Sequence, residues 1–184
     1  MAKQFARMEE AHQAFIWRQK VFFTASAAAQ GRVNISPKGL DTLRILDPNR
    51  VAYLDLTGSG NETAAHLAAT GRLTLMFCAF EGPPMILRLY GQGRVLRRGM
   101  EGYAEVLSAF GQELPGARQI VVLDVDLVQT SCGYAVPLLA YRRDRPNLIR
   151  WAEAKGPEGL EAYWREKNIR SIDGLPTGMP EAAE

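Results

Sequence analysis

The segment TGSGNET, residues 57–63, carries the groups best suited to hold an anion. It directly precedes the run AAHLAAT, which is typical of a helix, so its backbone N–H groups fall at a helix N-terminus. Free N–H groups and the positive end of the helix dipole favour a phosphate there, and Ser59, Asn61 and Thr63 add short polar side chains. A second interpretation stays open. Ser59 and Glu62 stand three apart, as in a capping box, and would then only cap the helix.

Two cations could accompany such an anion, because Glu62 itself opposes negative charge. Lys38 follows Ser36 and Pro37, and a lysine on a rigid turn is a positioned charge suited to phosphate. It could equally be an exposed loop lysine. Arg88 lies in MILRLYG among apolar neighbours. Strand alternation would place it either outward in solvent or inward against a carboxylate or ligand, and both remain open.

Other kinds of chemistry find no support in the residue pattern. His12 and His66 are the only histidines, and Cys78 and Cys132 the only cysteines, with no spacing typical of a metal site or a redox pair. No Ser or Cys lies in a nucleophile motif. Gly58–Asn61 has the sequence GSGN without a surrounding βαβ unit, which excludes a Rossmann dinucleotide site. We therefore predict no metal, and no catalytic residue can be named.

The elements that must position these residues are mainly strands. Helices are predicted at residues 4–19, from Glu62 to Gly71, and at 100–111. Apolar, strand-like runs cover 20–28, 32–36, 51–56, 72–80, 85–98 and 117–130, the fifth with a bulge or bend at Gly91 and Gly93. This order predicts a mainly β fold, a six-stranded antiparallel barrel with helical additions. A doubly wound parallel sheet is not expected, because it would need a regular alternation of strands and helices, which the sequence lacks.

The chain of 184 residues fits a single domain, 1–184, with a core at about 20–140 and an extension at 141–184. The extension is rich in Arg, Glu and Trp, and two short helices are predicted in WAEAKG and PEGLEAYWREKN. Its aromatic residues could cap the core, or cover a planar ligand or a subunit contact. They are Trp151, Tyr163 and Trp164.

Net charge and hydropathy limit the kinds of partner that the protein can have. The net charge is +2, from 22 basic and 20 acidic residues, without the clustered basic face that nucleic-acid binding calls for. No apolar run is long enough to span a membrane, and the polar start MAKQFARMEE is not a signal peptide. We expect a cytoplasmic protein that binds neither nucleic acid nor membrane.

Five segments carry a resemblance to a known family: GRVNISPKG, YLDLTGSGNETAAHL, GRLTLMFCAFEGPP, LRLYGQGR and SCGYAVP. Together they resemble the pyridoxamine 5′-phosphate oxidase-related, FMN-binding split-barrel family. The tail Lys167–Pro176, with the pattern KN-x-x-SIDGLP, resembles a subgroup of that family. The resemblance implies a six-stranded split barrel that forms a homodimer, with two FMN sites at the dimer interface.

The resemblance also implies which residues would contact FMN. The second strand would lie along the flavin ring and ribityl chain, which falls on Asn34, Ile35, Ser36, Pro37 and Lys38. The helix after the third strand would meet the phosphate, through Ser59, Asn61 and Thr63. Arg88 would point toward the cofactor or the dimer contact. Cys132, Gly133 and Tyr134 would line the far side of the ring, from the same subunit or its partner.

Two departures from the oxidase pattern bear on function. The true oxidases have a basic Arg-Lys pair where this chain has Glu62 and Thr63, and their tail has an Arg-Leu-x-Pro element where this chain has SIDGLP. We therefore expect a homodimeric FMN-dependent oxidoreductase that does not act on vitamin B6. The alternative is a carrier or sensor that holds FMN, haem or a deazaflavin without turnover. A third possibility is a ligand-free interaction scaffold.

Overall fold

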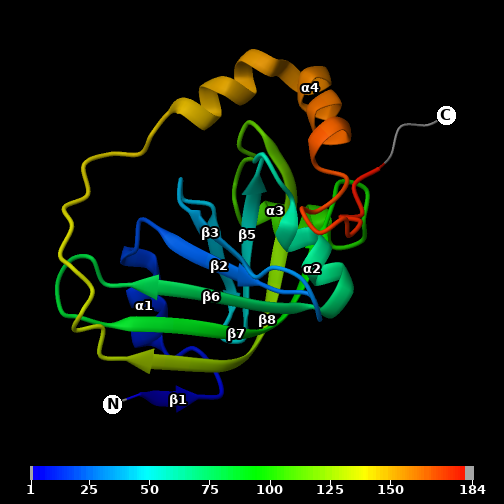
Figure 1. Ribbon diagram of the computed structural model, residues 1–184. Helices are drawn as coiled ribbons and strands as arrows, with labels where there is room; N and C mark the ends of the chain where they lie inside the picture. Colours follow the sequence, from blue (N-terminus) through cyan, green and yellow to red (C-terminus); the bar gives the residue numbers. More distant parts are fainter. Residues whose placement is uncertain (1, 181–184) are drawn as a thin grey trace.

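The computed structural model describes residues 2–180 and has a strongly curled antiparallel sheet, with helices around it (Figure 1). The mainly β split-barrel fold is confirmed, but the sheet has eight strands instead of six. The strands are β1 (Lys3–Phe5), β2 (Phe22–Ser26), β3 (Asn34–Lys38), β4 (Leu43–Asp47), β5 (Arg50–Leu56), β6 (Arg72–Cys78), β7 (Ile86–Leu96) and β8 (Ala117–Ser131).

The strand order is β3-β2-β6-β7-β8-β5-β4, with β1 paired to β8. The 15-residue β8 holds the two parts of the barrel together. Its first half pairs with β5 on one side, its last residues pair with β1, and β7 runs along its other edge. The predicted bulge is present as a register shift between Tyr90 and Gly91. A Cβ at Gly91 would lie 1.9 Å from the carbonyl oxygen of Asp124, so only glycine fits there.

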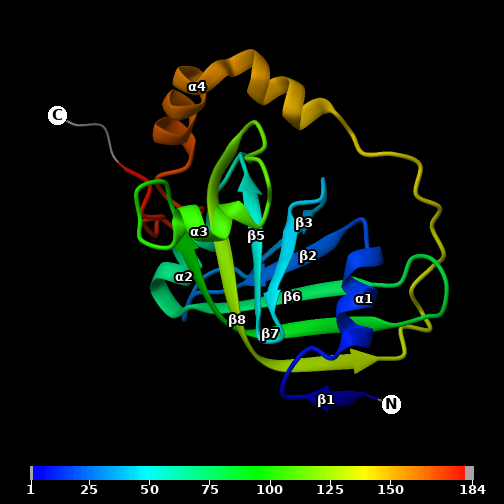
Figure 2. The same cartoon turned by 180° about the vertical axis from the view of Figure 1, so that it is seen from behind.

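Four helices surround the sheet: α1 (Glu10–Arg18), α2 (Glu62–Thr70), α3 (Tyr103–Ser108) and α4 (Asn147–Lys167). The predicted N-terminal helix begins six residues late, because residues 3–5 pair with β8 instead. The two predicted C-terminal helices are the halves of α4, which are separated by a break at Gly156 before Pro157. In both views α4 arches over the tips of β3 and β5 (Figures 1 and 2). None of the helices described could cross a membrane.

The main core fills the inside of the curled sheet, and alternation along the strands explains how it forms. In β2 and β6, every second residue is buried, whereas β5 is buried almost throughout because it packs on both faces. Phe15 and Ile16 of α1 join this core. A second apolar cluster lies beneath α3 and the start of α4, and a third packs α4 against Met179.

The sequence prediction was wrong for β1, β4 and the end of β3. β1 was assigned to a helix, and β4 was missed because LRILD is short and carries Arg44 and Asp47. Pro37 and Lys38 lie in β3, not in a loop. Since β3 is an edge strand, the missing N–H of Pro37 costs no pairing on its free side. This places the Lys38 side chain on a rigid strand beside β5.

Candidate functional site

A cavity of about 610 Å³ opens between the edge strand β3, the end of β5 and the start of α2. The turn Thr57–Gly60 forms one wall, Leu148 of α4 and Ile172 of the C-terminal tail lie at its margin, and Arg118 reaches it from β8. This volume is in the range of small-molecule and cofactor sites. The apolar part of the lining comes from Val33, Pro37, Leu40, Leu54, Leu56, Leu148 and Ile172.

The polar part of the lining is dominated by a buried carboxylate between two cations, here called the Asp55 ion cluster. Lys38 Nζ lies 2.7 Å from Asp55 Oδ1, and Arg118 Nε lies 2.9 Å from Asp55 Oδ2. The side chains of Asp55 and Arg118 are 1% and 4% exposed, and that of Lys38 is 19% exposed. Gln119 Nε2 donates a further hydrogen bond of 2.8 Å to Asp55. Two cations against one carboxylate leave a net charge of +1.

The electrostatics of this cluster keep Asp55 ionised. Burial by itself would raise the pKa of the Asp55 carboxyl, but the charges of Arg118 and Lys38 outweigh burial and hold that pKa well below its usual value. The same carboxylate and the surrounding apolar core raise the pKa of the buried Tyr53 hydroxyl, burial being the larger cause. Tyr53 also offers its ring to Lys38 Nζ, 5.6 Å from the ring centroid. The cluster is therefore a fixed positive charge beside the cavity.

Arg118 has hydrogen-bonding capacity left over. Its Nη1 donates to the carbonyl oxygen of Gly60 at 2.9 Å and to Asn168 Oδ1 at 2.7 Å. Its Nη2 makes no hydrogen bond to any residue that the structure describes, and Lys38 Nζ makes only the one to Asp55. A lysine ammonium has three donors and a guanidinium five. Both cations can therefore donate to an anion in the cavity.

The start of α2 forms the cavity wall beside this charge, but the predicted capping box is wrong. The N-cap is Asn61, without a side-chain cap, and the Glu62 carboxylate instead accepts from the N–H of Ile172 at 3.0 and 3.1 Å. The first N–H groups of α2 therefore have no side-chain acceptor from the capping box and lie at the positive end of the helix dipole. Asn61 itself is turned inward and buried.

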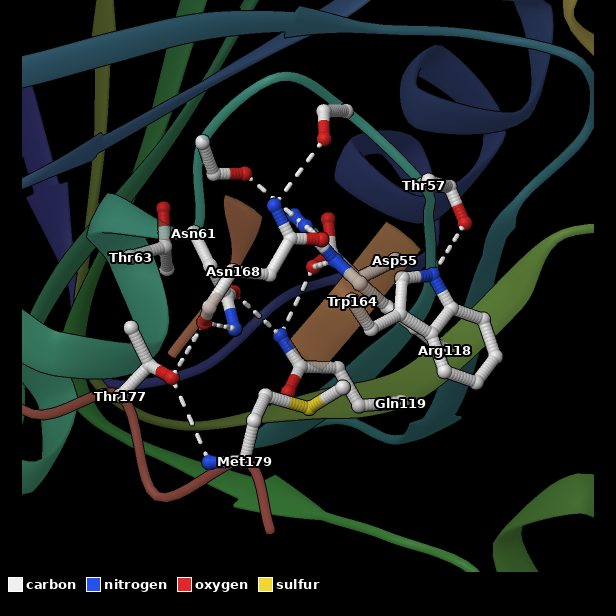
Figure 3. A network of polar contacts seen from close by, with 12 residues as sticks. Asp55, Thr57, Asn61, Thr63, Arg118, Gln119, Trp164, Asn168, Thr177 and Met179 are labelled. Atoms are coloured by element: carbon white, nitrogen blue, oxygen red, sulfur yellow. Dashed lines mark hydrogen bonds and ion pairs between the residues drawn. The ribbon is translucent and has the colours of Figure 1, made fainter. Parts of the chain in front are cut away.

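A polar network holds the Thr57–Gly60 turn in place from below (Figure 3). Asn168, which is completely buried, donates to the carbonyl oxygen of Gly58 at 3.2 Å and accepts from Arg118. Gln119 bridges Asp55 and Asn61 with two hydrogen bonds of 2.8 Å. Trp164 of α4 donates from Nε1 to Thr57 Oγ1 at 2.8 Å. The extension thus contacts the turn through side chains. Trp164 is buried and packs on the core, which is one of the three roles that the sequence left open for the aromatic set.

A second polar chain lines the cavity on the α2 side. Asn34 Nδ2 donates to Thr63 Oγ1 at 3.2 Å, and the hydroxyl groups of Thr63 and Ser26 are 3.5 Å apart. Ser26 Oγ in turn lies 3.1 Å from His66 Nδ1. His66 is buried and belongs to the lining. This chain fixes the side chains of β3 and α2 that face the cavity.

The structure brings together six of the twelve site residues predicted from sequence. Asn34, Ser36, Pro37, Lys38, Ser59 and Thr63 all line the cavity. Ile35 points outward from β3 and is 66% exposed, and Asn61 supports the turn from below. The other four, Arg88, Cys132, Gly133 and Tyr134, do not line this cavity within one described subunit.

The sequence left open whether Arg88 points outward or inward, and in the structure it points outward. It lies between Leu87 and Leu89, which are fully buried, so alternation turns it to the opposite face of β7. It is half-buried and donates to Ser131 Oγ at 3.0 Å. Tyr134 is 82% exposed beyond the end of β8. Neither side chain lines the cavity of the described subunit.

Sequence reasoning missed several residues that shape the cavity. Arg118 is the second residue of β8 and lies 63 positions from Asp55, so no local spacing links the two. One signal was present: Asp55 interrupts the apolar run VAYLDL, and a carboxylate inside a buried strand needs a cation. His66, Leu148, Asn168 and Ile172 were also missed. Within residues 2–180, no cluster of three or more His, Cys, Asp or Glu side chains could hold a metal ion.

Comparison with known proteins gives consistent results. The family model described as pyridoxamine 5′-phosphate oxidase matches residues 8–132. A protein of Aspergillus flavus, described as pyridoxamine 5′-phosphate oxidase family protein ustO, is 43% identical over 176 residues, covering 86% of this chain and 71% of that protein. The family model's match includes β3, the Thr57–Gly60 turn and α2, because these elements lie within residues 8–132.

Solved structures show the same fold. A variant of HupZ from group A Streptococcus aligns with a TM-score of 0.56 and 18% identity, over 67% of this chain and 99% of that one. A candidate pyridoxamine 5′-phosphate oxidase from Lactobacillus delbrueckii aligns with a TM-score of 0.52 and 20% identity, over 67% and 94% of the two chains. At such identities the likeness concerns the fold alone. The sequence matches carry the assignment further: the chain belongs to the pyridoxamine 5′-phosphate oxidase family.

Proposed function

We propose that the protein is a flavoprotein that binds FMN non-covalently in the cavity beside the Asp55 ion cluster. The observation that carries this proposal is the spare donor capacity of Arg118 and Lys38 next to the first turn of α2. A net positive cluster and free helix N–H groups are the groups that a phosphate monoester requires. Membership in the family supports a flavin as the molecule that bears the phosphate.

The residues present fit both ends of FMN. Ser59 and Thr63 supply hydroxyl groups at the α2 end, and Arg118 and Lys38 supply charge. The apolar side chains of Pro37, Leu54 and Leu56 offer a surface for a planar ring. The polar chain from Asn34 to His66 keeps the wall rigid, which lowers the entropy cost of binding.

We further propose that the protein is an oxidoreductase. A bound flavin supplies electron transfer to and from a substrate, and the protein supplies binding, orientation and electrostatics. The chain has SIDGLP where the oxidases have their Arg-Leu-x-Pro element, so the substrate is proposed to be a molecule other than vitamin B6. Anaerobic addition of NADH or NADPH should bleach the flavin absorbance. Absence of bleaching with either donor would favour the carrier or sensor instead.

The protein is also proposed to be a homodimer. The segment after β8 and the outer face of β3 expose large apolar side chains, which a second copy of the chain would cover. They are Ile35, Tyr134, Leu138, Leu139 and Tyr141. Size-exclusion chromatography with light scattering should give twice the chain mass of 20.4 kDa. A mass of one chain at micromolar concentration would overturn the dimer.

The absorption spectrum of freshly purified protein tests the central proposal. A yellow protein with the two flavin bands, whose released chromophore is FMN, is expected. Colourless protein that takes up no added FMN would refute the proposal and favour the scaffold.

A further inference from the structure

The tail segment Asn168–Thr177 forms part of the cavity wall, and it lies outside the residues matched by the family model. We call this segment the closing loop. It follows α4 and turns back on itself, with Arg170 and Pro176 paired as an isolated β-bridge. In Figure 1 the tail lies beside α2. Its position raises the question of what it does to a ligand in the cavity.

The inner end of the closing loop is anchored in the interior. Asn168 is held by Arg118 and by Gly58, as described above, and its own carbonyl oxygen accepts from Thr177 Oγ1 at 2.6 Å. Arg97, directly after β7, donates to the carbonyl oxygen of Thr177 at 2.6 Å. Three of these contacts fix the two ends of the loop to the barrel, and the fourth joins the two ends to each other. The loop is a built wall, not a loose tail.

The outer part of the closing loop is clasped to both sides of the cavity mouth. On the α2 side, the N–H of Ile172 donates to the Glu62 carboxylate. On the β3 side, Asp173 accepts from the backbone N–H of Arg32 at 2.7 Å and forms an ion pair with the Arg32 guanidinium. Arg32, Glu62 and Ile172 all line the cavity. The loop thus spans from β3 to α2 across this end.

Charge changes sign along the cavity. Deep inside, the Asp55 ion cluster carries a net charge of +1. At the clasp, Arg32 and Asp173 neutralise each other, and Glu62 forms no ion pair with any residue that the structure describes, which leaves a net charge of −1. One phosphate deep in the cavity is therefore favoured. A second phosphate placed further out would meet a carboxylate and the loop itself.

We infer that the closing loop makes the site select a flavin mononucleotide over a flavin dinucleotide. This inference rests on the proposed function. FMN ends at its phosphate, whereas FAD continues through a second phosphate into an adenosine. With the first phosphate at the Asp55 ion cluster and the start of α2, as proposed, that adenosine would extend toward the clasp. The loop blocks that path sterically through Ile172 and electrostatically through Glu62. The selection comes from disfavouring the wrong ligand as well as binding the right one.

The test is a parallel titration of the full chain with FMN and FAD, followed by flavin fluorescence. The wild type should bind FMN at least about tenfold more tightly than FAD. In the double variant Glu62→Ala/Asp173→Ala, which opens both sides of the clasp, FAD affinity should rise until the preference falls to about threefold or less. Asp144→Asn/Glu158→Gln removes two exposed carboxylates away from the cavity and should keep the wild-type preference.

Each outcome of these titrations supports or overturns a stated proposal. Equal affinity of the wild type for FMN and FAD, or an unchanged preference in the clasp variant, would overturn the inference while leaving FMN binding intact. No binding of either flavin would instead refute the proposed function. If circular dichroism shows that the alanine variant is unfolded, Glu62→Gln/Asp173→Asn is titrated in its place. This variant keeps the hydrogen-bond acceptors of the clasp but removes its negative charges, so the preference for FMN should fall, though less than in an opened clasp. An unchanged preference would overturn the inference.

Discussion

Arg118 Nε lies 2.9 Å from Asp55 Oδ2, and both side chains are almost completely buried. A buried ion pair adds little net stability, because each charge has lost its hydration, but removing one partner leaves the other unpaired in the interior. Here the carboxylate serves two cations at once, since Lys38 shares it. The pair therefore holds a positive charge next to the cavity that the protein could not otherwise bury.

Asp55→Asn should lower the free energy of unfolding by about 3–5 kcal/mol, because it leaves Arg118 and Lys38 without a counter-charge. Urea unfolding at neutral pH measures the loss. Asp126→Asn, an exposed position on β8, is the control and should change stability by no more than about 0.5 kcal/mol. A similar small change at Asp55 would show that the ion cluster is not formed in solution.

The stability of the wild type should also depend on acid through Asp55. The folded-state pKa of Asp55 lies below 3.8, the usual value for an aspartate side chain. Its contribution to stability is therefore fully present above about pH 5 and is lost as pH falls through 3.8 toward the folded-state pKa. Asp55→Asn should therefore show a weaker loss of stability between neutral pH and about pH 3 than the wild type. Parallel curves for the two proteins would contradict this.

Lys38→Ala should weaken FMN binding by roughly tenfold or more, because it turns the net charge of the ion cluster from +1 to zero and removes spare donors. Riboflavin, which lacks the phosphate, should bind the variant and the wild type alike. Fluorescence titration measures both ligands. Lys3→Ala, an exposed lysine on β1, is the matched control. Equal FMN affinity in Lys38→Ala and wild type would refute the role of Lys38.

Asn168→Ala should cost about 2–3 kcal/mol of stability, because Arg118 Nη1 and the carbonyl oxygen of Gly58 each lose a buried partner. Urea unfolding again gives the value. Asn147→Ala, at the exposed first residue of α4, should change stability by about 0.5 kcal/mol or less. If both substitutions had the same small effect, the closing loop would not be anchored as described.

Gly91→Ala should destabilise the barrel by about 2–3 kcal/mol, since its methyl group would overlap the carbonyl oxygen of Asp124 in the bulge between β7 and β8. Gly159→Ala in α4 is the control. Its nearest neighbour would be a Lys155 side-chain atom at 3.5 Å, an ordinary contact, and alanine favours the helix. Thermal unfolding should show a lower midpoint for the first variant only.

The sequence predicted the strands and the cavity walls far better than it predicted the charge between them. Alternation and glycine placement located β2, β5–β8 and the Thr57–Gly60 turn, because these signals are local. The Asp55–Arg118 pair depends on the register of β5 against β8, which places Asp55 opposite Gln119, and no local pattern reports a register. β1 escaped prediction for the same reason, since three residues gain strand structure only by pairing with β8.

The tail shows a different limit of prediction from sequence, because its motif was recognised but its contacts were not. The pattern KN-x-x-SIDGLP was recognised as a signature without any indication of what it contacts. The structure gives several of its residues a physical role: Asn168 fills a polar pocket beneath the turn, Ile172 meets Glu62 and Asp173 meets Arg32. Each partner lies more than 100 positions away in the sequence. Such contacts follow only from the assembled fold.

The proposed site is tested most directly by equilibrium titration of the wild-type protein with FMN and with riboflavin, side by side. We expect saturable binding of one FMN per chain, at least about tenfold tighter than riboflavin, because the phosphate would meet Arg118, Lys38 and the start of α2. Equal affinity for the two ligands, or no binding of FMN, would contradict it.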